Sequence, residues 1–363
     1  MRILLGKRIS ILNVTKEING KLYEKIYHRK PEWTHFIRIA NLNMEEIESI
    51  LLKMDVIHAE RGHQLANQVI LMCKHYSEDH LGYTLTEALI YKKYGKCRAC
   101  LEGKTILRRK DSKGRLIFVE YYLYGNMEGV HKHFYINDKY AFLLGISHKF
   151  KMRWTFDVGK DFKATDIQEA LELIFGDYRT TGKAIGFIRG DADPKFQPLR
   201  GWLQIIGLRL YMAPAGIKTS KAERAIRTEK KMIRTLVNEL QYIMPEDWIP
   251  FVVKEATYLL TIQFHEKLGK SPRESFFNEH YDYKSNCTFK FGDIISYPDT
   301  VTSSRYESRL NYGAIVGRDK LTGNLYVENL FDKQIDKVAI YKDKVPVDDA
   351  IKQYFKDYQD ITI

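Results

Sequence analysis

Residues 184–196 read AIGFIRGDADPKF, and the order of the elements around this segment indicates the fold class. Its first part, 184–189, is a short apolar run typical of a buried strand, which ends at Gly190-Asp191. Upstream, residues 164–175 have the apolar spacing of an amphipathic helix. Three earlier stretches are rich in β-branched and aromatic residues, as strands are: 116–124, 133–144 and 151–156.

Three strands, a helix and a fourth strand, in that order, predict an RNase H-like α/β fold. A short helix and a loop with Pro214 and Gly216 follow, and then helices over 221–242 and 250–268. Residues 271–275, SPRES, mark a boundary. The short strands expected beyond it predict a small SH3-like β-barrel: 289–297, 312–318, 324–329 and 334–341.

The N-terminal part is predicted to form strands and then helices. Residues 9–12 and 21–27 have strand-like composition and are separated by Asn19-Gly20, a strong hairpin signal. Asn43 suits the N-cap of the amphipathic helix that follows it. Helical periodicity continues from residue 58 to residue 100, and residues 92–115 form a loop with ten basic side chains.

Two histidines and two cysteines form a candidate metal site with the spacing His-x4-His-x33-Cys-x2-Cys: His58, His63, Cys97 and Cys100. Four nitrogen and sulfur ligands suit tetrahedral, structural zinc, with no position left for a substrate. His75 and His80 have the same spacing and compete as the histidine pair. The short gap from His80 to Cys97 leaves room for little more than one helix, so we expect His58 and His63. The alternative interpretation is that these are surface histidines and a buried thiol pair.

The charge of the chain suggests a polyanionic partner, most simply nucleic acid. The formal net charge is +12, with a balance of +13 in residues 1–279 and −1 beyond them. No apolar run is long enough to cross a bilayer, and the charged N-terminus does not resemble a secretory signal. Four cysteines do not make a secreted disulfide framework. We therefore expect no membrane and no small-molecule substrate.

Five motifs, in order, resemble those of retroviral and retrotransposon integrases. Residues 58–103 resemble the family's zinc domain, which ends in Cys-x2-Cys-x2-Gly-Lys. Asp191 to Phe196 resembles the family's Asp-x4-Phe, and KAERAIRT at 221–228 resembles its Gly-x-Ala-Glu-Arg-x-Asn-Arg-Thr helix start. MPEDW at 244–248 and KSPRE at 270–274 resemble Leu-Pro-x-x-Trp and Thr-Pro-Tyr-Glu. The resemblance is closest to copia-type integrases and covers residues 55–345.

The resemblance and the predicted elements together divide the chain into five segments. These are an N-terminal extension (1–54), a zinc-binding domain (55–108), an RNase H-like core (115–272), a small β-barrel (285–345) and a C-terminal tail (346–363).

The resemblance implies that Asp191 and Glu223 are the second and third carboxylates of a catalytic triad that holds Mg²⁺ or Mn²⁺. It also implies DNA contacts by basic side chains near the zinc domain and along the helix that starts near Glu223. These are Lys104, Arg108, Arg109, Arg224, Arg227, Lys230, Lys231 and Arg234. A solvated basic helix face is the alternative interpretation of the helical set. Integrases act as multimers, so self-association is expected.

The first carboxylate of the triad is missing, because Tyr122 stands at its place in 119–125, VEYYLYG. Asp157 precedes Asp191 by only 34 residues, so it belongs after the third strand and outside the site. Glu120 lies on the same strand face as Tyr122 but about 7 Å along the strand, a poor substitute. The family's Asn-Gly near Asp191 is replaced by Ala192-Asp193.

The sequence therefore favours an integrase-like DNA-binding protein with degraded strand-transfer chemistry. One alternative is an active Mg²⁺-dependent integrase that uses Asp191, Glu223 and Glu120 for 3′-end processing and strand transfer. A protein-interaction scaffold is another. The chain starts at Met1 without protease or reverse-transcriptase segments, so we expect a freestanding, domesticated derivative. A function on DNA implies that the protein resides in the nucleus or passes from cytoplasm to nucleus. Residues 108–113, RRKDSK, are a weak nuclear localisation signal.

Overall fold

The computed structural model describes most of the chain from residue 43 onward, and four strands before it. The described residues are 3–4, 11–18, 21–28, 34–37, 43–95, 97–104, 109–110, 116–117, 125–127, 129–136, 140–190, 194–212, 220–298, 310–319, 324–339, 341 and 343–360.

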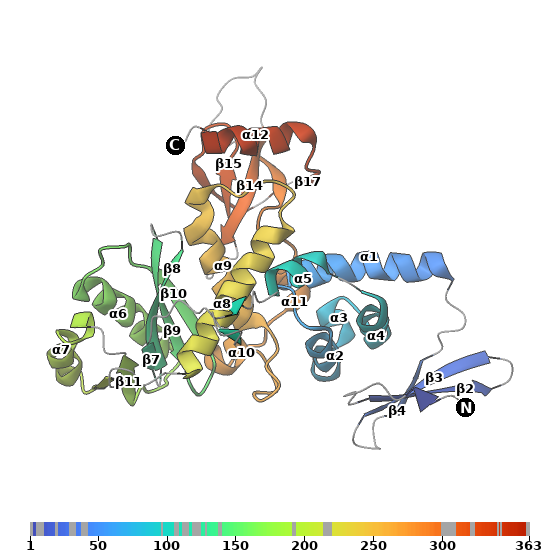
Figure 1. The fold of residues 1–363 in the computed structure, drawn as a ribbon, viewed down its shortest axis with the longest axis horizontal. Helices are drawn as coiled ribbons and strands as arrows, with labels where there is room; N and C mark the ends of the chain where they lie inside the picture. Colours follow the sequence, from blue (N-terminus) through green and yellow to red (C-terminus); the bar gives the residue numbers. More distant parts are fainter. Residues whose placement is uncertain are drawn as a thin grey trace.

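The N-terminal strands form an antiparallel sheet in the order β1-β2-β3-β4. Their bounds are β1 Ile3–Leu4, β2 Ile11–Ile18, β3 Lys21–His28 and β4 Thr34–Ile37. Strands β2 and β3 pair as far as Ile18 and Lys21. The expected hairpin is therefore present, with Asn19 and Gly20 between its paired strands. Figure 1 shows this sheet at one end of the molecule, beyond the first five helices.

Five helices follow: α1 Met44–Glu60, α2 Ala66–His75, α3 Glu78–Leu81, α4 Leu85–Tyr94 and α5 Arg98–Lys104. The predicted N-cap of α1 is confirmed, because the Asn43 side chain accepts from the Glu46 amide and Glu46 accepts from the Asn43 amide, both at 2.8 Å. Residues 98–104 are helical, so the expected basic loop contains α5. Further along it, β5 Arg109–Lys110 pairs with β6 Leu116–Ile117.

A six-stranded sheet forms the middle of the chain in the order β10-β9-β8-β7-β11-β12. Its strands are β7 Gly125–Met127, β8 Gly129–Ile136, β9 Tyr140–Ser147, β10 Arg153–Asp157, β11 Phe187–Gly190 and β12 Arg209–Met212. β8, β9 and β10 are antiparallel neighbours, whereas β11 and β12 are parallel. The chain is therefore of the mixed α/β class.

Two sequence predictions for this sheet were wrong in part, and one strand was missed. Residues 133–144 are not one strand but the end of β8 and the start of β9, because the apolar pattern continues across the hairpin. Of the strand expected at 116–124, Leu116 and Ile117 pair with β5 instead, and residues 118–124 lie outside the described part. Strand β12 was not predicted, because four residues of mixed exposure give a weak periodic signal.

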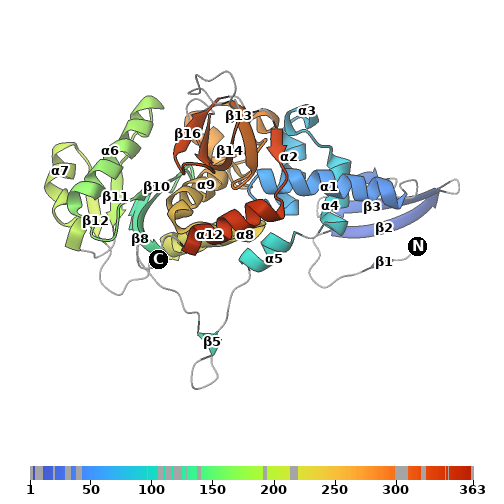
Figure 2. The ribbon, with the colours of Figure 1, turned by 90° about the horizontal axis from the view of Figure 1, so that it is seen from above.

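Helices cover both faces of the sheet (Figure 2). Ala141 and Leu143 of β9 pack with α6 Ala164–Thr180 and α7 Leu199–Ile205. The alternate residues Phe142 and Leu144 pack with the core of α8 Ser220–Glu239 and α9 Ile249–Ile262. This two-residue alternation is what a strand buried on both faces requires. Two short 3₁₀ turns complete this region, η1 Pro194–Phe196 and η2 Glu246–Trp248.

The C-terminal sheet has the order β16-β15-β14-β13-β17. Its strands are β13 Ile294–Pro298, β14 Leu310–Arg318, β15 Leu325–Asn329, β16 Ile335–Val338 and β17 Asp343–Val345. The pairing within the described residues leaves this sheet open, so the expected barrel closure is not found there. The segment expected as a tail contains helix α12 Asp349–Asp360, and its Phe355 is buried against Tyr242 at a ring distance of 4.0 Å.

One hydrophobic core joins the first helices, α8, α9 and the C-terminal sheet. It includes Met54 of α1, Leu236 of α8, Val253 of α9 and Ala314 of β14. Two short helices, α10 Pro272–Phe277 and α11 Tyr283–Asn286, connect α9 to that sheet. Within the described part of the chain, every helix is too short or too polar to cross a membrane.

Candidate metal centre and the helix beside it

Helix α1 delivers His58 to the interior. Met54, His58 and Ala59 are the buried residues of this helix, and the spacing 54/58 places the first two on one face. The His58 side chain therefore points away from solvent and toward α5. In the described part of the chain its Nδ1 atom is buried without a hydrogen-bond partner.

A left-handed turn after α1 brings His63 back to His58. Gly62 and His63 have φ values of 69° and 54°, and the His63 amide donates to the His58 carbonyl at 2.8 Å. A Cβ at Gly62 would lie 2.7 Å from Cβ of Leu259, so only glycine fits. The Gly62 carbonyl accepts from the Gln263 side chain at 2.6 Å. The two imidazole rings consequently meet edge to face at 4.9 Å.

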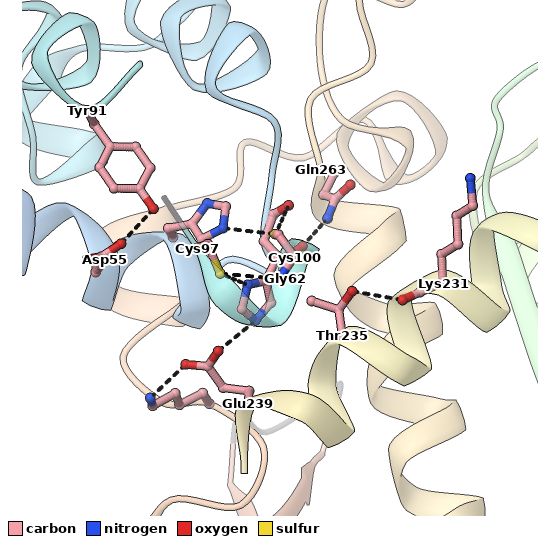
Figure 3. Close-up of polar contacts among 12 residues, drawn as sticks. Asp55, Gly62, Tyr91, Cys97, Cys100, Lys231, Thr235, Glu239 and Gln263 are labelled. Carbon is pink, nitrogen blue, oxygen red and sulfur yellow. Dashed lines mark hydrogen bonds and ion pairs between the residues drawn. The ribbon is translucent and has the colours of Figure 1, made fainter. Parts of the chain in front are cut away.

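The two cysteines come from the turn that begins α5. The Cys100 amide donates to Cys97 Sγ at 3.4 Å, so the start of the helix wraps around the first sulfur. Figure 3 shows both sulfurs facing the two imidazole rings. Hydrogen bonding to Cys100 and burial raise the pKa of Cys97. A metal ion bound by this pair would therefore displace protons.

The four ligand atoms lie within 4.8 Å of one another. His58 Nε2 is 3.2 Å from Cys100 Sγ, and His63 Nδ1 is 3.4 Å from Cys97 Sγ. A tetrahedral zinc ion with ordinary bond lengths separates its nitrogen and sulfur ligands by about 3.5 Å. The donor set and its spacing thus fit zinc, which would supply structural cross-linking and no open coordination position.

The competing histidines lie elsewhere. His75 is exposed and packs on Phe264 at a ring distance of 5.0 Å. His80 Nε2 is 2.7 Å from the Tyr281 carbonyl oxygen. Neither belongs to the cluster that contains Cys97 and Cys100.

Helix α5 packs directly on α8, and Figures 1 and 2 show the two side by side. Arg234 Nε donates to the Gly103 carbonyl at 3.1 Å. A Cβ at Gly103 would lie 2.4 Å from Oγ1 and 2.6 Å from Cα of Thr235. The glycine of the Cys-x2-Cys-x2-Gly-Lys motif is therefore required by close contact between helices.

Gly103→Ala is expected to lower the free energy of unfolding by about 1–3 kcal/mol, because the added methyl group overpacks the α5–α8 contact. Gly176→Ala in α6 is the matched control, since a Cβ there meets no described residue within 4 Å. This control should raise stability by about 0.5–1 kcal/mol, the ordinary gain of alanine over glycine in a helix. Urea unfolding of both variants measures the difference. Equal effects of the two substitutions would contradict the close contact.

The outer face of α8 carries cations. Arg224, Arg227 and Arg234 are exposed, and Lys230 and Lys231 are half-buried. Burial and the neighbouring Arg234 lower the pKa of Lys230. The opposite face is buried in the core shared with α9. Arg234 has a structural contact with Gly103, which the sequence did not reveal.

Four of the residues singled out in the sequence lie outside the described part of the chain: Arg108, Glu120, Tyr122 and Asp191. Strand β11 ends one residue before Asp191. Glu223 is in the first turn of α8, Lys104 ends α5 and Arg109 is in β5.

Asp157 ends β10, which the order of the sheet separates from β11 by three strands. Its carboxylate is exposed and accepts from the Gly159 amide at 3.1 Å. Neighbouring strands lie about 4.8 Å apart, so Asp157 is far from the end of β11. Asp157 therefore lies away from the strand that precedes Asp191, as the sequence led us to expect.

No protein-family model and no curated protein matches this chain. Among solved structures, it is similar to a chain in the simian T-cell lymphotropic virus intasome in complex with PP2A regulatory subunit B56 gamma. The identity is 13% over 82% of this chain and 100% of that chain, with a TM-score of 0.39. It is also similar to the catalytic core domain of BIV integrase, at 12% identity over 41% of this chain and 91% of that chain, with a TM-score of 0.33. Both TM-scores are low, so these similarities say nothing about what this chain binds.

Proposed function

We propose that this chain is an integrase-like DNA-binding protein of copia-type ancestry that acts in the nucleus on duplex DNA or DNA ends. One observation carries the proposal: α8 presents exposed arginines, and α5, which carries Cys100 of the His₂Cys₂ cluster, packs on the same helix. A rigid helix with regularly spaced arginines suits the phosphates of a duplex, because each contact releases a counterion.

The strand-transfer chemistry is proposed to be lost. Two-metal phosphoryl transfer needs carboxylates that converge on hard cations, and a phenol at Tyr122 does not meet that need. The residues that the sequence assigns to the site thus do not fit a complete Mg²⁺ or Mn²⁺ pair. DNA binding does not require them, since it depends on cations along the helix.

DNA binding is tested by the dependence of affinity on salt. Arg224→Gln/Arg227→Gln is expected to lower the slope of log K against log salt concentration by about 2, close to 0.9 per lost phosphate contact. Arg179→Gln/Arg200→Gln removes the same charge from exposed positions on α6 and α7 and should leave the slope unchanged. If both double variants reduced the slope equally, DNA affinity would depend on the net charge of the chain and not on the arginines of α8. Absence of duplex binding by the wild type would favour a protein-interaction scaffold.

Catalysis is tested separately, with Mg²⁺- or Mn²⁺-dependent nicking and strand transfer on labelled duplex ends. We expect no turnover from the wild type, Asp191→Asn or Glu223→Gln, with DNA binding intact in all three. Activity that both substitutions abolish would establish an active integrase instead. Glu120→Gln would then test the remaining carboxylate.

A further inference from the structure

The Glu239 carboxylate of α8 lies next to His63, on the side of the ring that faces away from the cysteines. His63 directs Nδ1 toward Cys97 Sγ at 3.4 Å, and its other ring nitrogen, Nε2, is 3.5 Å from Glu239 Oε2 (Figure 3). The His63 side chain is fully buried, and that of Glu239 is 21% exposed. The two residues are far apart in sequence, and Glu239 is the last residue of α8. No motif predicts this pairing.

The chemistry of a ligating imidazole explains the arrangement. When Nδ1 binds a metal, Nε2 carries the hydrogen, and a carboxylate is a strong acceptor for it. Such a partner fixes the tautomer and the ring orientation and makes the ligating nitrogen more basic. At 3.5 Å the Glu239 oxygen is within ion-pair distance of Nε2 and somewhat farther than in an ordinary hydrogen bond.

The same carboxylate is held from its other side. Glu239 Oε1 is 3.1 Å from Lys290 Nζ, in the segment that leads into the C-terminal sheet. Lys290 is itself fixed, because its amide donates to Asp293 at 3.2 Å. Glu239 thus lies between a metal ligand and a cation, and both of its oxygens are engaged.

We infer that Glu239 is a positioning residue for zinc: it holds His63 in the ligating orientation and ties the metal centre to α8. This inference rests on zinc occupancy of the His₂Cys₂ centre. Helix α8, which is proposed to bind DNA, would thus also support the metal through Glu239.

The test compares zinc affinity in the full-length chain, measured by competition with a chromophoric chelator. Glu239→Gln is expected to bind zinc 10–100-fold more weakly, the usual loss for such a partner. Glu102→Gln is the matched control, because Glu102 is an exposed carboxylate two residues after Cys100 and pairs with Arg98 instead. Its affinity should stay within about 2-fold of the wild type.

A second comparison separates metal positioning from a merely structural role. Lys290→Met breaks the outer contact of Glu239 and leaves the His63 contact in place. If Glu239 acts only as a link between α8 and Lys290, both variants lose equal stability after chelation and retain zinc equally. The inference instead requires Glu239→Gln alone to lose affinity and to change the visible absorption of the Co²⁺-substituted chain. Wild-type affinity in Glu239→Gln overturns the inference, and a wild-type chain that takes up no zinc overturns the metal centre itself.

Discussion

Cys97→Ser is expected to abolish zinc retention and to lower the free energy of unfolding by about 4 kcal/mol. The loss of about 4 kcal/mol applies at a free zinc concentration roughly 1,000 times the wild-type Kd, where zinc binding stabilises the folded state by this free energy. The reason is geometric. Cys97 Sγ lies 3.4 Å from His63 Nδ1, and its removal leaves three potential ligands, two buried histidines and the half-buried Cys100. A serine hydroxyl replaces a thiolate poorly as a zinc ligand.

Zinc content by atomic absorption and urea unfolding, each with and without chelator, measure this effect. Chelator should lower the stability of the wild type to that of Cys97→Ser and leave the variant unchanged. Cys73→Ser is the control, since Cys73 lies on α2 outside the cluster and burial raises its pKa to about 12. It should keep one zinc per chain. Zinc retention by Cys97→Ser, or equal loss in both variants, would contradict the assignment.

The sequence predicted those features that local chemistry determines. The start of α1 at Asn43 could be predicted because a capping box involves only two residues three positions apart, here Asn43 and Glu46. The close pairs His58/His63 and Cys97/Cys100 predicted the His₂Cys₂ cluster because the two members of each pair are only a few residues apart in the sequence. The pattern of residues 164–175 predicts α6 for the same reason, since an amphipathic helix repeats within itself.

Features that depend on distant contacts could not be predicted. Gly62 is required by Leu259, and Gly103 by Thr235, so the need for glycine appears only when the helices meet. Helix α12 was expected as a tail because the burial of Phe355 depends on a partner more than a hundred residues earlier, Tyr242.

Another contact between residues far apart in the sequence joins the six-stranded sheet to a helix. It is the pair of Arg153 in β10 and Glu229 in α8. Arg153 Nη1 lies 2.9 Å from Glu229 Oε2, with side-chain exposures of 14% and 0%. Thr257 of α9 donates to the other carboxylate oxygen at 2.6 Å. Burial raises the pKa of Glu229 above its ordinary value, and Arg153 and Thr257 act in the opposite direction. The pair thus joins the sheet to two helices.

Arg153→Met is expected to lower the free energy of unfolding by about 3–5 kcal/mol near pH 8, because it leaves a carboxylate buried without its cation. The double variant Arg153→Met/Glu229→Met should recover most of this loss, since an apolar pair of similar volume needs no desolvation. Removal of the cation raises the folded-state pKa of Glu229 further, while the unfolded-state pKa stays ordinary. A group with a raised folded-state pKa contributes stability below its unfolded-state pKa and loses that contribution as pH rises through the folded-state value. The deficit of the single variant should therefore shrink when the pH is lowered from 8 toward 5, as Glu229 takes up a proton.

Urea unfolding of the wild type, the single variant and the double variant at pH 8 and pH 5 checks both parts of this prediction. The double variant lacks the buried carboxylate, so its difference from the wild type should vary less with pH than that of the single variant. A deficit in Arg153→Met that is equal at the two pH values would mean that the lost packing of the arginine stem, and not the buried, unpaired charge of Glu229, causes the instability. A double variant as unstable as the single one would show that Arg153 acts through its bond to the Ala225 carbonyl, which the structure places at 3.2 Å. The expected pattern, a pH-dependent single variant and a recovered double variant, would identify the unpaired buried charge of Glu229 as the cause of the instability.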